Sequence, residues 1–294
     1  MRTIRLAEGL GWPEGPAVLP DGSVVFVETY LGRIARWTKD GGVREHAFVG
    51  GGPNAVVAAA DGALYLTQNG GVVGAWRSDH PRPASIQRIG PDGRVEVLAT
   101  EIDGHVLRAP NDLAFGPGGR LYFTDPVGGY DPVNRPDPGY ILALDPDGTG
   151  AVLAELPPVF PNGIAVEADG SVVWVESYTR AVRRLRGDGV IEEVCVLPAT
   201  TIPDGFKIAA NGDFYIAGVT NAGIDVVRRD GTFVETIPVG LCATNCAFDG
   251  GTLYVTDGGP PGTPGQPAMG GCLWALELDG VTGAAPFPGP GGAR

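Results

Sequence analysis

The stretch EGPAVLPDGSVVFVE, residues 14–28, places a glutamate before an apolar strand, an Asp-Gly turn and a second apolar strand. Asp-Gly supplies the positive φ that a tight hairpin turn needs, so the segment is typical of two antiparallel strands. Glutamate is a weak turn former, and its position at the mouth of a hairpin therefore needs another explanation. Five further segments of the same form provide one.

The six segments each contain an apolar strand, a Gly-containing turn and a β-rich return strand. Third strands such as RIARW (33–37), YILAL (140–144), VRRL (182–185) and CLWAL (272–276) follow. Repeats of about 40–57 residues with several strands each are typical of propeller blades, whereas a β-sandwich would not need six equivalent units. We therefore expect an all-β fold, a six-bladed β-propeller forming a single domain over residues 1–294. The repeats begin at Glu14, Asn54, Asn111, Asn162, Asp204 and Asn245, at spacings of 40, 57, 51, 42 and 41 residues.

The composition argues against several classes of partner. The chain has a net charge of −13 and no Lys/Arg-rich run, so we expect neither nucleic acid nor an anionic membrane. No apolar run approaches the roughly 18 residues of a membrane span, and the first residues lack the apolar stretch of a signal peptide. The four cysteines form no paired CxxC sites. We expect a cytoplasmic protein with reduced cysteines, a monomer or small homo-oligomer, with a Cys242–Cys246 redox pair as the alternative.

The first residue of each repeat should lie on a ring around the propeller axis, because the first strand of each blade lines the central channel. Every member of this ring carries a side-chain oxygen. Buried carboxylates and amides suit a hard divalent cation such as Ca²⁺, Mg²⁺ or Mn²⁺, so we expect a central metal site. The alternative is that Asn and Asp before Gly simply form turns, which explains any single Asn well but explains Glu14 poorly.

Four stretches carry a further signal: WPEGP (12–16), RAPNDLAFGPGGRLYFTDP (108–126), FPNGIAVEADGSVVWV (160–175) and IPDGFKIAANGDFYIA (202–217). Together they resemble the senescence-marker-protein/gluconolactonase/luciferin-regenerating-enzyme family. This resemblance implies a six-bladed propeller with one catalytic divalent cation, Ca²⁺ in the first place and Mn²⁺, Mg²⁺, Zn²⁺ or Fe²⁺ as alternatives. It implies metal ligands at Glu14, Asn111, Asn162 and Asp204. We expect the other two ring residues, Asn54 and Asn245, to line the pocket or form turns.

The resemblance also implies a metal-dependent hydrolase that opens a lactone, a small-molecule substrate. Its cation would polarise the carbonyl, and we assign catalytic roles to Asp204 and Asn111, with Asp204 as the general base and a metal-bound hydroxide as the alternative. Many lactonases of the family carry a basic residue shortly before the PND motif that helps to hold substrate, which makes His105 and Arg108 candidates. Other esters or organophosphates at the same site, or a non-catalytic binding propeller, are the alternative functions.

Two further sets of residues surround the expected site. Three long loops, 69–84, 126–139 and 258–271, should wall the pocket and bring Trp76 and Tyr130 to it. Their apolar character favours a lactone less polar than gluconolactone. The ends of the return strands should form an outer ring, which either orients the metal ligands or is simply exposed to solvent. Its members are Glu28, Gln68, Asp125, Glu176, Ala217 and Asp257.

Overall fold

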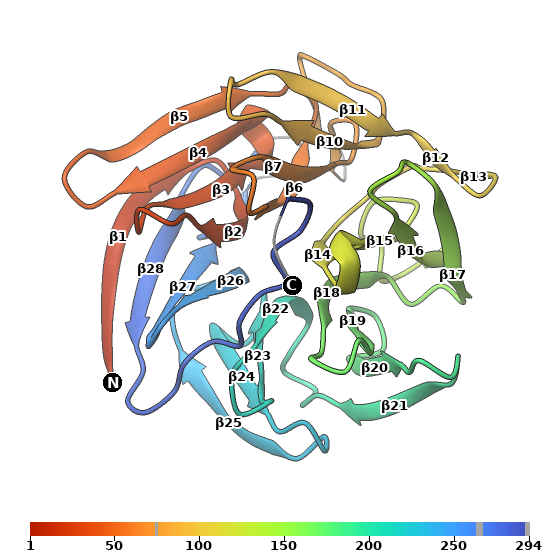
Figure 1. Ribbon diagram of the computed structural model, residues 1–294. Helices are drawn as coiled ribbons and strands as arrows, with labels where there is room; N and C mark the ends of the chain where they lie inside the picture. The colour runs from red at the N-terminus through yellow and green to blue at the C-terminus, as the bar shows by residue number, and fades with distance from the viewer. Residues whose placement is uncertain (74–75, 263–266, 292–294) are drawn as a thin grey trace.

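Each of the six sequence repeats forms the two inner strands of a four-stranded antiparallel sheet, which confirms the expected six-bladed β-propeller (Figure 1). The computed structural model describes residues 1–73, 76–262 and 267–291. Within these residues the sheets are arranged around a central axis with their innermost strands toward it. The third strands expected from the sequence are also present.

The first three blades follow the chain in simple order from the axis outward. The first contains β2 (Pro13–Val18), β3 (Val24–Glu28), β4 (Arg33–Thr38) and β5 (Gly42–Phe48). The second contains β6 (Pro53–Ala58), β7 (Leu64–Gln68), β10 (Ser85–Ile89) and β11 (Val95–Ala99). The third contains β14 (Leu113–Phe115), β15 (Leu121–Asp125), β16 (Gly139–Leu144) and β17 (Gly150–Leu156).

The last blade differs from the others because it takes its outer strand from the start of the chain. The fourth blade contains β18 (Pro161–Val166), β19 (Val172–Glu176), β20 (Ala181–Leu185) and β21 (Ile191–Val196). The fifth contains β22 (Pro203–Ile208), β23 (Phe214–Gly218), β24 (Gly223–Val227) and β25 (Phe233–Pro238). The sixth contains β26 (Ala243–Asp249), β27 (Thr252–Asp257), β28 (Gly271–Glu277) and β1 (Arg2–Leu10). Pairing of β1 with β28 thereby joins the two ends of the propeller.

Four small elements lie outside the blades. Two of them are short β-hairpins, and the other two are single 3₁₀ turns that follow β3 and β14. No helix among the described residues has the length and apolar character needed to cross a bilayer. The hairpins are β8 (Val72–Val73) with β9 (Trp76–Arg77) and β12 (Glu101–Ile102) with β13 (His105–Val106); the turns are η1 (Thr29–Leu31) and η2 (Pro117–Gly119).

The hydrophobic core lies between neighbouring blades rather than in one central mass. Between the fourth and fifth blades, Val173 and Val175 of β19 belong to the same buried cluster as Phe206 and Ile216. Alternate side chains of each inner strand point to opposite neighbours, so each blade contributes to two such interfaces. This packing leaves the axis itself to be lined by the first strands.

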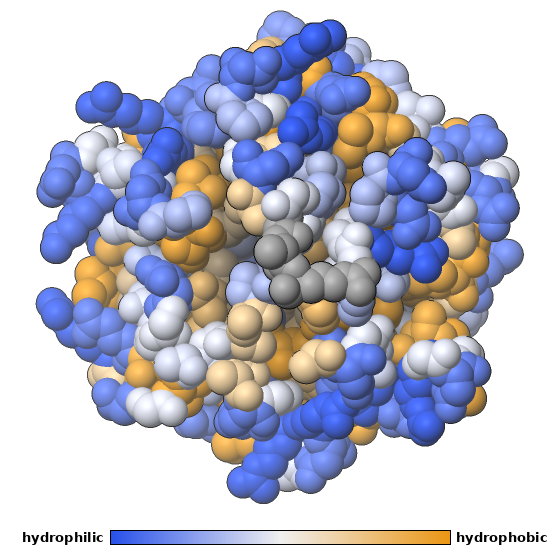
Figure 2. Space-filling view, viewed as in Figure 1, coloured by the Kyte–Doolittle hydropathy of each residue, from blue (hydrophilic) through white to orange (hydrophobic). Residues whose placement is uncertain are grey.

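The C-terminal segment crosses the axis on one face of the propeller (Figure 1). It is fixed to the fifth blade by Ala284 N, which donates to Ile208 O at 3.0 Å, and to the second by Ala60 N, which donates to Pro288 O at 2.7 Å. Figure 2 shows apolar residues near the centre of this face. Beneath the segment lies a cavity of about 200 Å³ lined mainly by apolar residues of the inner strands and of 284–287. Because these contacts lie at the far ends of β22 and β6, the segment covers the face opposite the ring residues.

Candidate functional site at the propeller axis

Five buried polar side chains from five blades come together at one end of the axis. Asn245 Nδ2 donates to Glu14 Oε2 at 3.1 Å and to Asp112 Oδ2 at 3.3 Å. The amide of Asn162 acts on Asp204, whose pKa it lowers. The exposed fraction of each of the five residues is at most 9%. They are Glu14, Asp112, Asn162, Asp204 and Asn245.

Local backbone geometry explains how these side chains reach the axis. In five of the inner strands the pairing register shifts next to the ring residue, as between Glu14 and Ala17 or between Pro203 and Phe206, which is the signature of a β-bulge. The neighbouring strands also approach closely here, because a Cβ on Gly205 would overlap the Asn245 amide. Glycine after the ring residue therefore permits the convergence.

Hydroxyl groups of one blade fix the ring position of the next blade. Thr67 Oγ1 donates to Asn111 O at 2.5 Å, and Thr124 Oγ1 donates to Asn162 O at 2.7 Å. Similar bonds from Thr29, Ser177 and Thr244 reach the carbonyls of Pro53, Pro203 and Pro13, the residues just before Asn54, Asp204 and Glu14. Five of the blade junctions thus carry a hydrogen bond that orients the backbone of a ring residue.

The polar residues of the outer ring are buried, and they make no hydrogen bond with the axial side chains among the described residues. Glu28, Gln68, Asp125, Glu176 and Asp257 are at most 3% exposed. Most of them accept hydrogen bonds from the loop that leads into the first strand: Asp125 from Arg108 N and Ala109 N, at 3.0 and 2.9 Å, and Asp257 from Cys242 N at 2.9 Å. These side chains therefore hold the backbone that presents Asn111 and Asn245.

Burial and neighbouring charges raise the pKa of two axial carboxyl groups, those of Asp204 and Glu14. Burial raises the pKa of Asp204 to about 8, with the charge of Asp112 adding to it and the Asn162 amide opposing it. Burial, followed by the charges of Asp204 and Asp112, raises the pKa of Glu14 well above its ordinary value. Three carboxyl groups in one buried site are costly unless protons or a cation neutralise them.

The donors of this site fit a hard divalent cation. Asn111 contributes a buried side-chain oxygen, Oδ1, that has no hydrogen-bond partner among the described residues. Asn111 directly precedes Asp112, and an unpaired buried acceptor together with three buried carboxyl groups is the environment that an oxygen-liganded cation would relieve. Within the described residues, no three or more His, Cys, Asp or Glu side chains are arranged to hold a metal ion, so the amide oxygens of Asn would have to complete the ligand set.

The remaining pocket residues expected from the sequence occupy different surroundings. His105 Nε2 lies 3.0 Å from Asp125 Oδ2, and its ring stacks on Tyr140 with 3.9 Å between centroids. It therefore supports Asp125 and the loop before Asn111. Arg108 is exposed, with its backbone amide bound to Asp125, and Asn54 is partly exposed at the start of β6.

A hollow of about 680 Å³ opens beside the axial residues and has an aromatic wall. The Tyr30 ring packs edge-to-face against Trp12 at 6.0 Å and against Trp76 at 5.0 Å between centroids. Cys242 also lines the hollow, and its pKa is raised to about 12 by burial and by the charges of Asp204, Asp257 and Glu14. These charges show that the hollow adjoins the axial carboxylates. Loops 69–84 and 258–271 contribute lining residues, as expected; positions 74–75 and 263–266 lie outside the described residues.

A second aromatic group stands over the third and fourth blades. Tyr130 from the loop 126–139 packs against Phe160 and Tyr178, with ring centroids 5.3 and 5.2 Å apart. Burial, then Tyr178, raises the pKa of Tyr130, and the charge of Asp204 contributes to this increase. Tyr130 therefore lies within electrostatic reach of the axis. In its cluster, Phe160 directly precedes β18, the strand that carries Asn162, and Tyr178 N donates to Val159 O.

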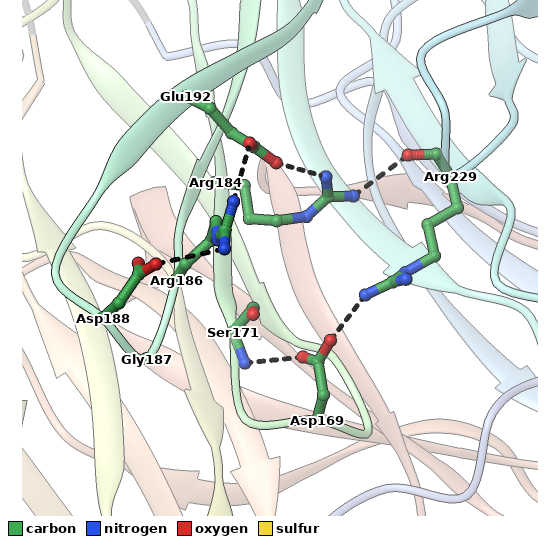
Figure 3. A pocket seen from close by; sticks show the side chains of 8 residues that line it. All are labelled: Asp169, Ser171, Arg184, Arg186, Gly187, Asp188, Glu192 and Arg229. Carbon is green, nitrogen blue, oxygen red and sulfur yellow. Dashed lines mark hydrogen bonds and ion pairs between the residues drawn. The ribbon is translucent and has the colours of Figure 1, made fainter.

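A second, polar hollow lies on the fourth and fifth blades, and its charged side chains are bound to one another (Figure 3). Arg184 and Arg229 both bind the buried Glu167, each through an Nε that donates at 2.7 Å. Arg184 also donates to Glu192 at 2.8 Å, and Arg229 pairs with Asp169. The ion pairs of this cluster join the two blades. Because its arginines are already paired with carboxylates, the cluster offers no binding site for an anion.

Asp112 is the principal site residue that the repeat pattern did not single out. Its Oδ1 accepts from Leu113 N at 2.8 Å, and its Oδ2 accepts from Ile164 N at 3.4 Å as well as from Asn245. The second position of the other five repeats is Gly, Ala or Cys. The carboxylate at this position in the third repeat was therefore the sequence feature that could have identified Asp112 as a site residue.

Comparison with known proteins agrees with this architecture. A gluconolactonase of Zymomonas mobilis is 26% identical over 290 residues, covering 85% of this chain and 77% of its own. A gluconolactonase structure from Xanthomonas campestris superposes with a TM-score of 0.76 at 24% identity, covering 95% of this chain and 89% of that one. A calcium-binding regucalcin from Agrobacterium tumefaciens has a TM-score of 0.73 at 18% identity, covering 94% and 93%. The model of the SMP-30/Gluconolactonase/LRE-like region matches residues 12–258, and the chain therefore belongs to this family.

Proposed function

We propose that this protein is a metal-dependent hydrolase that opens the ring of a lactone at the axial site. The observation that carries the proposal is the burial of Glu14, Asp112 and Asp204 in one cluster, together with the unpaired side-chain oxygen of Asn111, the residue before Asp112. Membership of a family that includes the gluconolactonase of Zymomonas mobilis supports the reaction type. The calcium-binding regucalcin neighbour supports a divalent cation, with Ca²⁺ in the first place.

The residues that would hold the cation are Glu14, Asn111, Asn162 and Asp204. All four present oxygen atoms, which hard divalent cations prefer, and Mn²⁺, Mg²⁺, Zn²⁺ and Fe²⁺ are the alternatives to Ca²⁺. When bound, such a cation supplies Lewis acidity toward a carbonyl and stabilises developing negative charge.

The protein's own groups divide the remaining work. Without a cation, burial and the charge of Asp112 raise the pKa of Asp204 to about 8. A cation bound beside it would keep this carboxyl group deprotonated, so that it could accept a proton from water as a general base. The amide of Asn245 donates to both Glu14 and Asp112 and so fixes the orientation of two carboxylates. The aromatic walls around Tyr30 and Tyr130 exclude water from a bound ring.

A panel of lactones tested on metal-stripped protein, with each cation restored in turn, examines the proposal. We expect hydrolysis of at least one lactone that returns with a divalent cation and is absent without it. An aryl ester and an organophosphate triester in the same panel distinguish the alternative substrates. Cation-dependent turnover of only one of these would replace the lactone in the proposal, and no turnover under any cation would favour a binding protein.

A further inference from the structure

The hollow beside the axial site has a continuous aromatic wall built from three separate segments. Trp12 lies just before β2, Tyr30 lies on η1, and Trp76 lies on β9. The interplanar angles are 62° between Trp12 and Tyr30 and 72° between Tyr30 and Trp76, so the rings contact each other edge-to-face. Such packing fixes the rings and leaves their outer faces available to a flat apolar group.

This wall reaches the residues of the proposed reaction. Trp12 is two positions before Glu14 on the same strand entry. Cys242 lines the hollow, and the charges of both Asp204 and Glu14 contribute to its raised pKa. A ligand whose reacting group lies at the axis would therefore place its substituent against Trp12, Tyr30 and Trp76.

Part of the polar surface around the hollow is committed to the fold. Thr220 Oγ1 donates to Thr200 O at 2.7 Å and accepts from Ile202 N at 2.9 Å. The backbone N–H of Cys242 donates to Asp257 Oδ1 at 2.9 Å, and its carbonyl accepts from Gly258 N at 2.8 Å. A substrate with several hydroxyl groups would exchange water for an apolar surface here, which is unfavourable, whereas an aryl or alkyl group gains from burial.

We infer that the substrate is a lactone that carries an aryl or alkyl group, which binds in the hollow lined by Trp12, Tyr30 and Trp76. The inference rests on the proposed lactone hydrolysis and specifies its substrate class. The hollow, about 680 Å³, lies in the range of about 300–1,000 Å³ that is usual for small-molecule pockets and accommodates a fused or branched ring.

The test compares dihydrocoumarin, a lactone fused to an aromatic ring, with glucono-δ-lactone in the cation-loaded protein. We expect kcat/KM to be at least about tenfold higher for dihydrocoumarin, and Trp76→Ala to lower that value by about tenfold while changing the gluconolactone value less than about twofold. Trp37→Ala removes an indole that packs against Tyr254 outside the hollow and serves as the matched control. A preference of about a hundredfold for gluconolactone that Trp76→Ala leaves unchanged would overturn the inference while leaving lactone hydrolysis intact.

A binding measurement separates failure of the inference from failure of the proposed function. Chroman, the cyclic ether that corresponds to dihydrocoumarin without its carbonyl, cannot be hydrolysed and needs no cation. We expect metal-free protein to bind chroman, with about tenfold weaker binding in Trp76→Ala and unchanged binding in Trp37→Ala. If no lactone is hydrolysed, weaker chroman binding in Trp76→Ala alone still supports recognition of an aryl group in the hollow. Equal chroman binding by the wild type, Trp76→Ala and Trp37→Ala contradicts that recognition.

Discussion

The side-chain amide of Asn245 donates to Glu14 Oε2 at 3.1 Å and thereby joins two residues that lie 231 positions apart in the chain. The same nitrogen donates to Asp112 at 3.3 Å, so a single neutral amide stands between two buried carboxylates. It links the first, third and sixth blades at the axis. The electrostatic balance of the site therefore depends on an uncharged donor at this position.

Asn245→Asp should strongly destabilise the metal-free protein. The substitution removes the donor and adds a fourth carboxyl group to the site, between Glu14 and Asp112, where burial already raises the pKa of Glu14. Asn54→Asp adds the same charge at a partly exposed ring position and is the control. Differential scanning calorimetry at pH 8 should show a much larger fall in Tm for Asn245→Asp, and equal falls would contradict this role of the amide.

Metal-free protein should lose stability as the pH rises from about 4 to about 8. The folded pKa of Asp204 is about 8 against an ordinary value of 3.8, so the folded state retains a proton that the unfolded chain has lost. The stabilisation is complete below the lower value and is lost as the pH passes the higher one. Asp204→Asn cannot titrate, so its Tm should depend less on pH and should exceed that of the wild type at pH 8. Parallel pH profiles of Tm would show that Asp204 is not the titrating group.

One divalent cation should bind per chain and should stabilise the protein more at pH 8 than at pH 6. Ligand carboxyl groups must lose their protons before they bind, so binding strengthens with pH and releases protons. Elemental analysis after dialysis against Ca²⁺ or Mn²⁺ measures the stoichiometry, and calorimetry in two buffers measures the protons. Glu14→Gln should abolish binding, whereas Asp188→Asn, on an exposed turn, should not. A stoichiometry near zero with every cation would contradict the site.

Asp204→Ala should abolish turnover while the propeller persists. The blades are held by strand pairing and by the β1–β28 closure, neither of which uses this side chain. We expect kcat to fall by at least about 10²-fold, the usual effect of losing a general base or a key electrostatic group. Circular dichroism provides the control for folding. Near-normal turnover would remove Asp204 from the mechanism, and a collapsed spectrum would make it a structural residue.

Gly205→Ala should destabilise the protein even though alanine is the smallest possible addition. Its methyl group would overlap the side-chain amide of Asn245, and overpacking of this kind costs about 1–3 kcal/mol. A Cβ on Gly187 would meet no atom within 4 Å, so Gly187→Ala should be neutral or stabilise slightly. Chemical denaturation of both variants measures the difference, and equal stabilities would show that the inner strands can separate at no cost.

The sequence predicts the blades well because their signals are local. Each inner hairpin combines an apolar pair of strands with a Gly-containing turn, and the repetition of this unit identifies the propeller without any long-range information. The position of the first residue in each repeat follows from the same count, and the structure brings Glu14, Asn162, Asp204 and Asn245 to one end of the axis.

Other features depend on contacts that a repeat count cannot contain. Strand β14 begins at Leu113, so both Asn111 and Asp112 precede it, and the side chain of Asp112 joins the site through its contact with Asn245. The pairing of β1 with β28 joins segments from opposite ends of the chain. His105 matched the expected position of a basic residue, but the structure uses its ring to hold Asp125, because a buried carboxylate needs partners.

The C-terminal segment leaves one end of the propeller axis for a ligand to approach. Residues 284–288 cover the end opposite the ring residues. If the axial site opens a lactone as proposed, we expect the substrate to enter and the acid product to leave on the same side, past the hollow lined by Trp12 and Tyr30. Product release and substrate binding would then compete for one opening.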